Sequence, residues 1–327
     1  MAGLRIVMLG TGDFAVPSFA ALYQTPHQVL GLYTQPDRMR TGKEVHRNRM
    51  KETALEHGTP VFQPEKINTP EALEELAGLR ADVFIVAAYG QILSRKFLAI
   101  PPLGSFNIHA SLLPKYRGAA PINYAILNGE TETGVSLIEV VLALDAGPVV
   151  GVVKTPIRPH ETAGELEERL GLLAAPLTAE FVDRLQHGTV ERVPQDPNLV
   201  TLAPKMQKEF GSVPWQKRAD EIDWHVRAMQ PWPNAFTYLH QAGRPPRRLV
   251  IRQVAAAEGP ANTQPTGTVL LAEKNQLLVQ CGSGPVSIVQ IQPEGKKPMS
   301  AGDYLRGNRL VPGDRFGAEL SEPSSAL

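Results

Sequence analysis

An amide and an imidazole side chain stand two positions apart in the stretch FNIHASLLPKYRG. Asn107 and His109 end an apolar run that is typical of a strand, so alternation along the strand places both side chains on one face. Together an amide and an imidazole can bind one carbonyl oxygen, where negative charge develops as a nucleophile attacks the carbon. For His109 taken alone, a purely structural histidine is the alternative interpretation.

An acidic residue follows the next apolar run. Asp145, in LALDAGPVV, opens a loop that contains glycine. Ligands of open α/β sheets bind beyond the carboxyl ends of the strands, so we expect this loop and the one after His109 to face one crevice. A carboxylate beside His109 would raise the basicity of the imidazole and hold its ring. Asn107, His109 and Asp145 are therefore the candidate catalytic residues.

A glycine motif near the N-terminus suggests a different chemistry. The sequence GTGDFA follows the apolar run LRIVML and has the Gly-x-Gly-x-x-Ala spacing of a dinucleotide-binding turn, with Asp37 after the second strand where a ribose-binding acid would stand. Ala15 replaces the third glycine, Pro17 follows closely, and a lone glycine motif is weak. The motif favours a tight turn after the first strand of an α/β fold, with a nicotinamide or flavin enzyme as the alternative.

The elements that must position these residues alternate in type over the first 190 residues. Apolar runs typical of buried strands cover residues 4–9, 29–34, 81–88, 104–110 and 133–141. Amphipathic, helix-like stretches cover residues 16–24, 47–58, 69–79 and 161–188. This alternation predicts a mostly parallel sheet covered on both faces, hence the α/β class.

The sequence pattern changes in the second half of the chain. Scattered prolines suit a linker, and a helical stretch at 218–229 precedes short β-like runs between 266 and 295. The runs predict a small antiparallel β-barrel, OB-like in type. We therefore expect a catalytic domain over 1–190, a linker over 191–207, a barrel domain over 208–315 and a disordered tail over 316–327.

Composition limits the possible classes of protein. The chain of 327 residues has no net charge and one cysteine, so an internal disulfide and a cysteine-based metal centre are both excluded. It shows neither a signal-like leader nor a long apolar run, which predicts a cytoplasmic protein that does not bind membranes. The second half is slightly basic and the first slightly acidic, a division that suits a module facing a polyanion.

The segments around the candidate residues are similar to a known family. FNIHASLLPKYRGAAPI, followed by LDAGP, resembles the formyltransferases that use 10-formyltetrahydrofolate. GTGDFAVPSF, GTPVFQPEKI, LAPKMQKE and QPWPNAFTYL extend the resemblance over most of residues 4–315, toward those members that formylate methionyl-tRNA. The resemblance implies a Rossmann-like catalytic domain, and it assigns oxyanion stabilisation to Asn107 and His109 and proton transfer to Asp145.

The resemblance also implies binding residues and partners. It implies that initiator methionyl-tRNA is the acceptor, that the formyl donor is a co-substrate, that no metal is needed, and that the protein is a monomer. The implied folate-binding residues are Ser111, Leu112, Leu113 and Pro114, with the backbone of Tyr89, Gly90, Gln91, Ile92 and Leu93. On the acceptor side, the implied residues are Phe14 near the aminoacyl group and the basic residues Arg40, Lys43, Arg47 and Arg49 on phosphates.

Other functions fit parts of the sequence. A formyltransferase acting on glycinamide ribonucleotide or on an amino-sugar nucleotide is the nearest alternative. The basic second half, with Arg244, Arg247 and Arg248 in RPPRR, favours a larger anionic acceptor. A non-catalytic RNA-binding protein is disfavoured because all three candidate catalytic residues are present.

Overall fold

The computed structural model describes residues 3–37, 48–258 and 264–319. The chain divides into two compact units. The first unit comprises Met1–Pro121, Glu132–Ile157 and Glu165–Pro204, and the second comprises Ile122–Thr131, Arg158–Gly164 and Lys205–Leu327.

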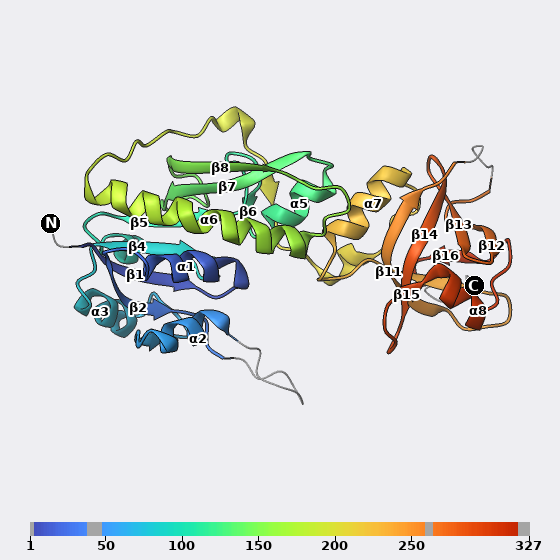
Figure 1. Cartoon of the computed structure of the whole chain (residues 1–327), viewed down its shortest axis with the longest axis horizontal. Coiled ribbons are helices and arrows are strands. Elements are labelled where there is room, and N and C mark those ends of the chain that lie inside the picture. The colour runs from blue at the N-terminus through green and yellow to red at the C-terminus, as the bar shows by residue number, and fades with distance from the viewer. Residues whose placement is uncertain (1–2, 38–47, 259–263, 320–327) are drawn as a thin grey trace, which may run out of the picture. The chain divides into compact units, whose positions relative to one another are not determined.

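The first unit is built on a seven-stranded sheet with the order β3-β2-β1-β4-β5-β7-β8 (Figure 1). Its strands are β1 (Arg5–Gly10), β2 (Gln28–Tyr33), β3 (Val61–Phe62), β4 (Val83–Ala87), β5 (Ser105–His109), β7 (Glu132–Glu139) and β8 (Val149–Pro156). Neighbours from β3 to β5 pair in parallel, whereas β7 and β8 pair antiparallel. The predicted α/β fold with a parallel-rich sheet is confirmed.

Helices cover this sheet, and they include those expected from the sequence. They are η1 (Asp13–Ala15), α1 (Val16–Leu22), α2 (Arg49–Glu56), α3 (Pro70–Gly78), α4 (Arg95–Leu98) and α6 (Ala163–Gln186). Helix α5 (Pro121–Leu127) belongs to the second unit from Ile122 onward. Helix α3 begins where Thr69 accepts the N–H of Ala72 at 3.3 Å. Among the helices of the described residues, none is both long and apolar enough to cross a bilayer.

Apolar side chains fill both faces of the sheet. Helix α6 runs along one face, where the ring of Phe181 lies 4.6 Å from that of Phe106 on β5 (Figure 1). A second core cluster includes Phe84 on β4 and Phe97 on α4, with Tyr89 after β4. Burial raises the pKa of the Tyr89 hydroxyl to about 12. Burial of each large apolar side chain stabilises the folded state by roughly 1.5–3 kcal/mol. Packing on two faces therefore holds the strand ends in place.

The second unit contains a separate antiparallel sheet with the order β12-β13-β14-β11-β10-β16, to which β15 is added beside β14. The strands are β10 (Phe236–His240), β11 (Arg247–Ala256), β12 (Val269–Glu273), β13 (Gln276–Cys281), β14 (Gly284–Pro293), β15 (Met299–Ser300) and β16 (Arg315–Gly317). The sheet is curled, and the N–H of Val269, at the start of β12, donates to the carbonyl of Asp314, next to β16, at 2.8 Å. Helices α7 (Ala219–Ala228) and α8 (Ala301–Gly307) pack on it, and the short helices η2 (Pro197–Leu199) and η3 (Lys208–Gly211) precede it.

Two expected boundaries differ from the structure. The tail does not begin at 316, because Phe316 pairs with Leu239 in the sheet and its buried ring stacks on Trp215; residues 320–327 lie outside the described residues. The stretch expected as a linker is packed on the first unit up to Pro204, since β9 (Leu202–Ala203) pairs with β6 (Arg117–Gly118). Backbone hydrogen bonding to distant segments, which composition does not reveal, decides both cases.

A buried histidine makes the stability of the second unit depend on pH. Burial of His225 on α7 lowers the pKa of its imidazole to about 4, against about 6.5 in an unfolded chain. Between these values the unfolded state binds more protons, so the free energy of unfolding falls as the pH falls, by about 3 kcal/mol in all. Between pH 7 and pH 4, we expect the free energy of unfolding of His225→Leu to fall by about 3 kcal/mol less than that of the wild type.

Tryptophan fluorescence during urea unfolding measures this difference, because Trp215, Trp224 and Trp232 all belong to the second unit. His187→Gln, an exchange of an exposed histidine, is the control and should keep the pH dependence of the wild type. Equal pH dependence in His225→Leu and the wild type would contradict the prediction.

Candidate active site

Strand β5 places Asn107 and His109 at one edge of the first sheet. Val86 near the end of β4 pairs with Asn107, and Gly10 at the end of β1 pairs with Ala87. The loops that follow β1, β4 and β5 therefore leave the sheet at the same carboxyl edge. His109 is buried, with 5% of its surface exposed, whereas Asn107 is half-buried.

Asp145 reaches the same place by a route that the sequence did not predict. We expected the carboxyl ends of two strands to lie side by side, but β7 is antiparallel to β5, and its last residue, Glu139, pairs with Phe106 at the start of β5. The loop from 140 to 148 must therefore return past β5. It passes close to the sheet, since a Cβ on Gly147 would lie 1.7 Å from the carbonyl oxygen of Glu139.

The carboxylate of Asp145 lies between the amide and the imidazole. Its Oδ1 is 3.5 Å from Asn107 Nδ2, and its Oδ2 is 3.7 Å from His109 Nδ1. A firmer bond at 2.9 Å comes from the backbone N–H of Gly118 to Oδ2. The first two distances exceed the usual length of about 2.9 Å for an N–H···O bond, so the Asn107 amide can still donate to an incoming oxygen. The structure thus brings the three candidate catalytic residues together.

The protonation state of His109 follows from its surroundings. Burial lowers the pKa of the imidazole, and this effect outweighs the opposing influence of Asp145 and of the Tyr116 carbonyl. At neutral pH the ring is therefore neutral and carries one proton. Because a carbonyl only accepts, the 2.9 Å bond to Tyr116 takes the proton on Nε2 and leaves Nδ1 facing Asp145.

The segment from Ser111 to Pro114 begins directly after β5, beside the candidate catalytic residues. Ser111 is fully buried, its Oγ donates to the carbonyl of Lys115 at 2.7 Å, and its own carbonyl accepts from Ser136 Oγ at 2.7 Å. The same Ser136 oxygen accepts the N–H of Leu113. The serine is thus a structural clamp, and Leu112, Leu113 and Pro114 are half-buried.

The segment from Tyr89 to Leu93 leaves the same edge after β4. The ring of Tyr89 belongs to the core, and the side chain of Gln91 accepts the N–H of Ile67 at 2.8 Å and donates to the carbonyl of Pro64 at 3.2 Å. Gly90 has a left-handed φ of +79°, which glycine adopts without strain. Ile92 is 88% exposed, and Leu93 packs on the core. Tyr89 and Gln91 therefore shape this loop with their side chains.

The residues expected on the acceptor side are placed only in part. Phe14 lies in η1 after β1 and is buried, with its backbone against the position of Gly171 on α6. Arg49 is exposed at the first position of α2. Arg40, Lys43 and Arg47 lie outside the described residues. Across the described ranges, His, Cys, Asp and Glu side chains form no group of three or more that could hold a metal ion.

Sequence reasoning missed the groups that hold Asp145 and His109 in place. These are the N–H of Gly118, the carbonyl of Tyr116 and the side chains of Arg117 and Gln195. Arg117 and Gly118 stand just after the Ser-Leu-Leu-Pro segment, which is a signal that could have found them. Gln195 stands among prolines in VPQDPN and carries no such signal.

Family models match both units of this chain. Residues 4–178 match the formyl transferase model, and residues 205–309 match the formyl transferase C-terminal domain. The chain therefore belongs to the formyl transferase family. It is 41% identical over 318 residues to the methionyl-tRNA formyltransferase of Geobacter metallireducens, covering 97% of this chain and 100% of the relative.

Solved structures of low sequence identity share the fold. An N-formyltransferase from Helicobacter canadensis, in complex with folinic acid and dTDP-3-aminofucose, has a TM-score of 0.64 at 18% identity, covering 87% of this chain and 98% of that one. HypX from Aquifex aeolicus, in complex with tetrahydrofolic acid, has a TM-score of 0.60 at 18% identity. The match to HypX covers 93% of this chain, which spans about half (47%) of the HypX chain.

Proposed function

We propose that this protein transfers a formyl group from 10-formyltetrahydrofolate to the α-amine of methionyl-tRNA, which yields formylmethionyl-tRNA for translation initiation. The observation that carries the proposal is the 41% identity to a methionyl-tRNA formyltransferase along that relative's entire length. The meeting of Asn107, His109 and Asp145 at one sheet edge supports the same chemistry.

In the proposed reaction the uncharged amine attacks the formyl carbon, a C–N bond forms, and the carbonyl electrons move onto oxygen. The bond from the formyl carbon to N10 of the folate then breaks, and the proton lost by the amine ends on N10. The amide N–H of Asn107 stabilises the oxyanion, and His109 does so once its Nδ1 has taken the proton of the attacking amine. Asp145 stabilises the imidazole while it carries this extra proton, which then passes to N10, and so assists the proton transfer.

The arrangement of Asp145 suits this role. Its Oδ2 is held by the N–H of Gly118, while its longer contacts to Asn107 and His109 leave those groups ready for the substrate. Catalytic hydrogen bonds are often long before the substrate binds and shorten in the complex. The neutral state of His109 also avoids placing a cation where an amine must stay uncharged.

The segments at the same edge are assigned to folate. Ser111 to Pro114 would line the folate pocket, and backbone groups of residues 89–93 would meet the pteridine ring. The internal hydrogen bonds of Gln91 and Ser111, which fix the two loops at this edge, support the assignment. Phe14, in the loop after β1, is assigned to the aminoacyl end.

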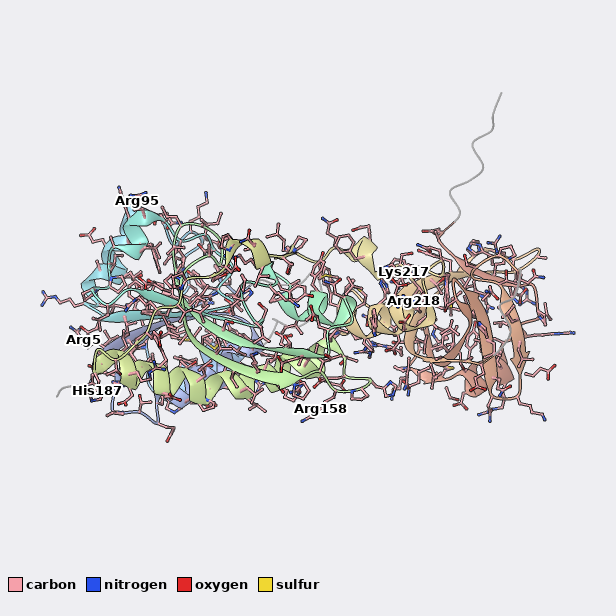
Figure 2. All side chains as sticks on the ribbon, turned by 90° about the horizontal axis from the view of Figure 1, so that it is seen from above. Arg5, Arg95, Arg158, His187, Lys217 and Arg218 are labelled. Carbon is pink, nitrogen blue, oxygen red and sulfur yellow. The ribbon has the colours of Figure 1, made fainter. Side chains whose placement is uncertain are left out.

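The second unit is assigned to tRNA binding as an OB-like barrel. Closure is supported by hydrogen bonds between the ends of its sheet, from Val269 to Asp314 and from Phe316 to Gly267, each at 2.8 Å. Lys217 and Arg218, labelled in Figure 2, are poor phosphate ligands because they pair with Glu221 and Asp220. Arg244 is exposed and suits phosphate binding better. We also assign the protein to the cytoplasm, as a monomer.

Formyl transfer from 10-formyltetrahydrofolate to charged methionyl-tRNA tests the proposal. We expect incorporation into methionyl-tRNA and none into uncharged tRNA. Glycinamide ribonucleotide and an amino-sugar nucleotide serve as rival acceptors. Turnover with either rival that exceeds turnover with methionyl-tRNA would refute the proposal.

The basic residues before and at the start of α2 should bind phosphates of the acceptor stem. Alanine at Arg40, Lys43, Arg47 and Arg49 together should raise the KM for methionyl-tRNA and flatten the plot of log affinity against log salt by up to about 0.9 per lost contact. The KM for folate should not change. Steady-state kinetics across a salt series measures both effects.

The matched control replaces Arg95 and Lys96, an exposed basic pair on α4, by alanine. It should keep the salt dependence of the wild type. If the quadruple variant also keeps the wild-type KM and slope, the segment is only a solvated surface and tRNA binds elsewhere.

A further inference from the structure

A side-chain amide outside the catalytic trio holds the loop that carries Asp145. Gln195 Nε2 donates to the carbonyl of Asp145 at 2.8 Å and to that of Gly147 at 2.7 Å. Its Oε1 accepts from Arg117, at 3.1 Å from Nε and 2.8 Å from Nη2. Since carbonyls only accept and a guanidinium only donates, these four hydrogen bonds define which end of the Gln195 amide is the nitrogen and which is the oxygen.

The loop needs restraint at Asp145 beyond what apolar packing supplies. Asp145 has a φ of +46°, in the left-handed region that residues other than glycine seldom adopt. Such a conformation persists only where the surroundings enforce it. Hydrophobic burial does not do so here, since Leu142 and Leu144 are 57% and 68% exposed. Hydrogen bonds to the loop backbone must therefore supply the restraint.

Gln195 also connects the two groups of atoms that fix the carboxylate. On one side it binds the backbone of Asp145 itself. On the other it binds Arg117, whose neighbour Gly118 donates its N–H to Asp145 Oδ2. Gln195 is half-buried, whereas all the remaining residues from 191 to 199 are exposed. This side chain is thus the inward-facing member of its segment.

We propose that Gln195 is a positioning residue for formyl transfer, holding the Asp145 carboxylate between Asn107 and His109 by bridging the Asp145 loop to Arg117. This assignment rests on the proposed function for its kinetic consequence. Its structural consequence, a loop that loosens when the amide is removed, does not depend on that function.

Two variants distinguish the hydrogen bonds that Gln195 donates to the Asp145 loop from those that it accepts from Arg117. Gln195→Met keeps the length of the side chain and removes both sets of hydrogen bonds. Gln195→Glu keeps an acceptor for Arg117 but has no N–H for the carbonyls of Asp145 and Gly147. Asn198→Ala is the matched control, because the side-chain amide of this neighbour donates within its own turn, to Asp196 Oδ1 at 3.0 Å.

We expect both Gln195 variants to lower kcat by about 10- to 100-fold, the effect of a small misplacement of a catalytic group. The KM values for folate and methionyl-tRNA should stay near those of the wild type, since no binding group is removed. Hydrogen exchange without substrates should show faster exchange of the Gly118 amide in both variants. Asn198→Ala should match the wild type in all three measurements.

A kcat within about twofold of the wild type in Gln195→Glu would overturn the proposal, because well-placed catalytic groups normally matter by more than that. If the wild type itself fails to formylate methionyl-tRNA, the proposed function fails, and hydrogen exchange alone decides the role of Gln195. Unchanged protection of the Gly118 amide in Gln195→Glu would then refute it.

Discussion

We expect Asp145→Asn to lower kcat for formyl transfer by about 100-fold or more, because a proton-transfer group typically contributes that much. The carboxylate faces Asn107 and His109, and the asparagine keeps its shape while removing its charge. Asn107→Ala and His109→Ala should each cost about 100-fold as well, through loss of oxyanion stabilisation. Single-turnover kinetics on methionyl-tRNA measures the chemical step directly.

The three residues should act as a unit. The double variant Asn107→Ala with Asp145→Asn should then be little slower than the worse single variant, since effects within one catalytic group are not additive. Asp183→Asn, at an exposed position on α6, is the control and should keep wild-type turnover. A folded Asp145→Asn protein with near-normal kcat would remove the proposed mechanism.

Gly118→Ala should damage both the stability of the first unit and its turnover. Gly118 has a φ of +127°, and an added Cβ would lie 2.5 Å from the carbonyl oxygen of Ala203 on β9. The backbone conformation alone costs of the order of 1–3 kcal/mol in an L-residue, and the clash pushes β6 and β9 apart. Because the Gly118 N–H binds Asp145, we expect kcat to fall by about 100-fold as that carboxylate moves.

Thermal unfolding and kcat measured on the same samples test this result. Gly78→Ala, at the end of α3, is the matched control, because its Cβ would meet no atom within 4 Å. It should unfold at or slightly above the wild-type temperature, since alanine favours a helix. Wild-type stability and turnover in Gly118→Ala would show that β6 can shift without disturbing Asp145.

The sequence alone determined the strand that carries the candidate catalytic pair, Asn107 and His109. Asn107 and His109 end an apolar run that is typical of a strand. Side chains alternate between the two faces of a strand, so both lie on one face wherever the strand is placed in the sheet. Helix α3 could be predicted for a similar reason, because Thr69 and Pro70 define its start through bonds within a few residues. Interactions between residues so close in the chain can be inferred from the sequence alone.

Only the tertiary structure decided how Asp145 reaches that pair. The antiparallel direction of β7 reverses the expected route, and it follows from how distant strands pack. Phe316 shows the same limit at the end of the chain, where pairing with Leu239 gives order to residues that composition alone made look disordered.

The surroundings of Asp145 were beyond sequence reasoning for the same physical reason. The Tyr116 carbonyl and the Gly118 N–H are backbone groups, which every residue possesses, and only the fold aims them at His109 and Asp145. Gln195 is far along the chain from both. Residue type and spacing could therefore indicate the candidate catalytic side chains, whereas long-range hydrogen bonds determine which partners hold them.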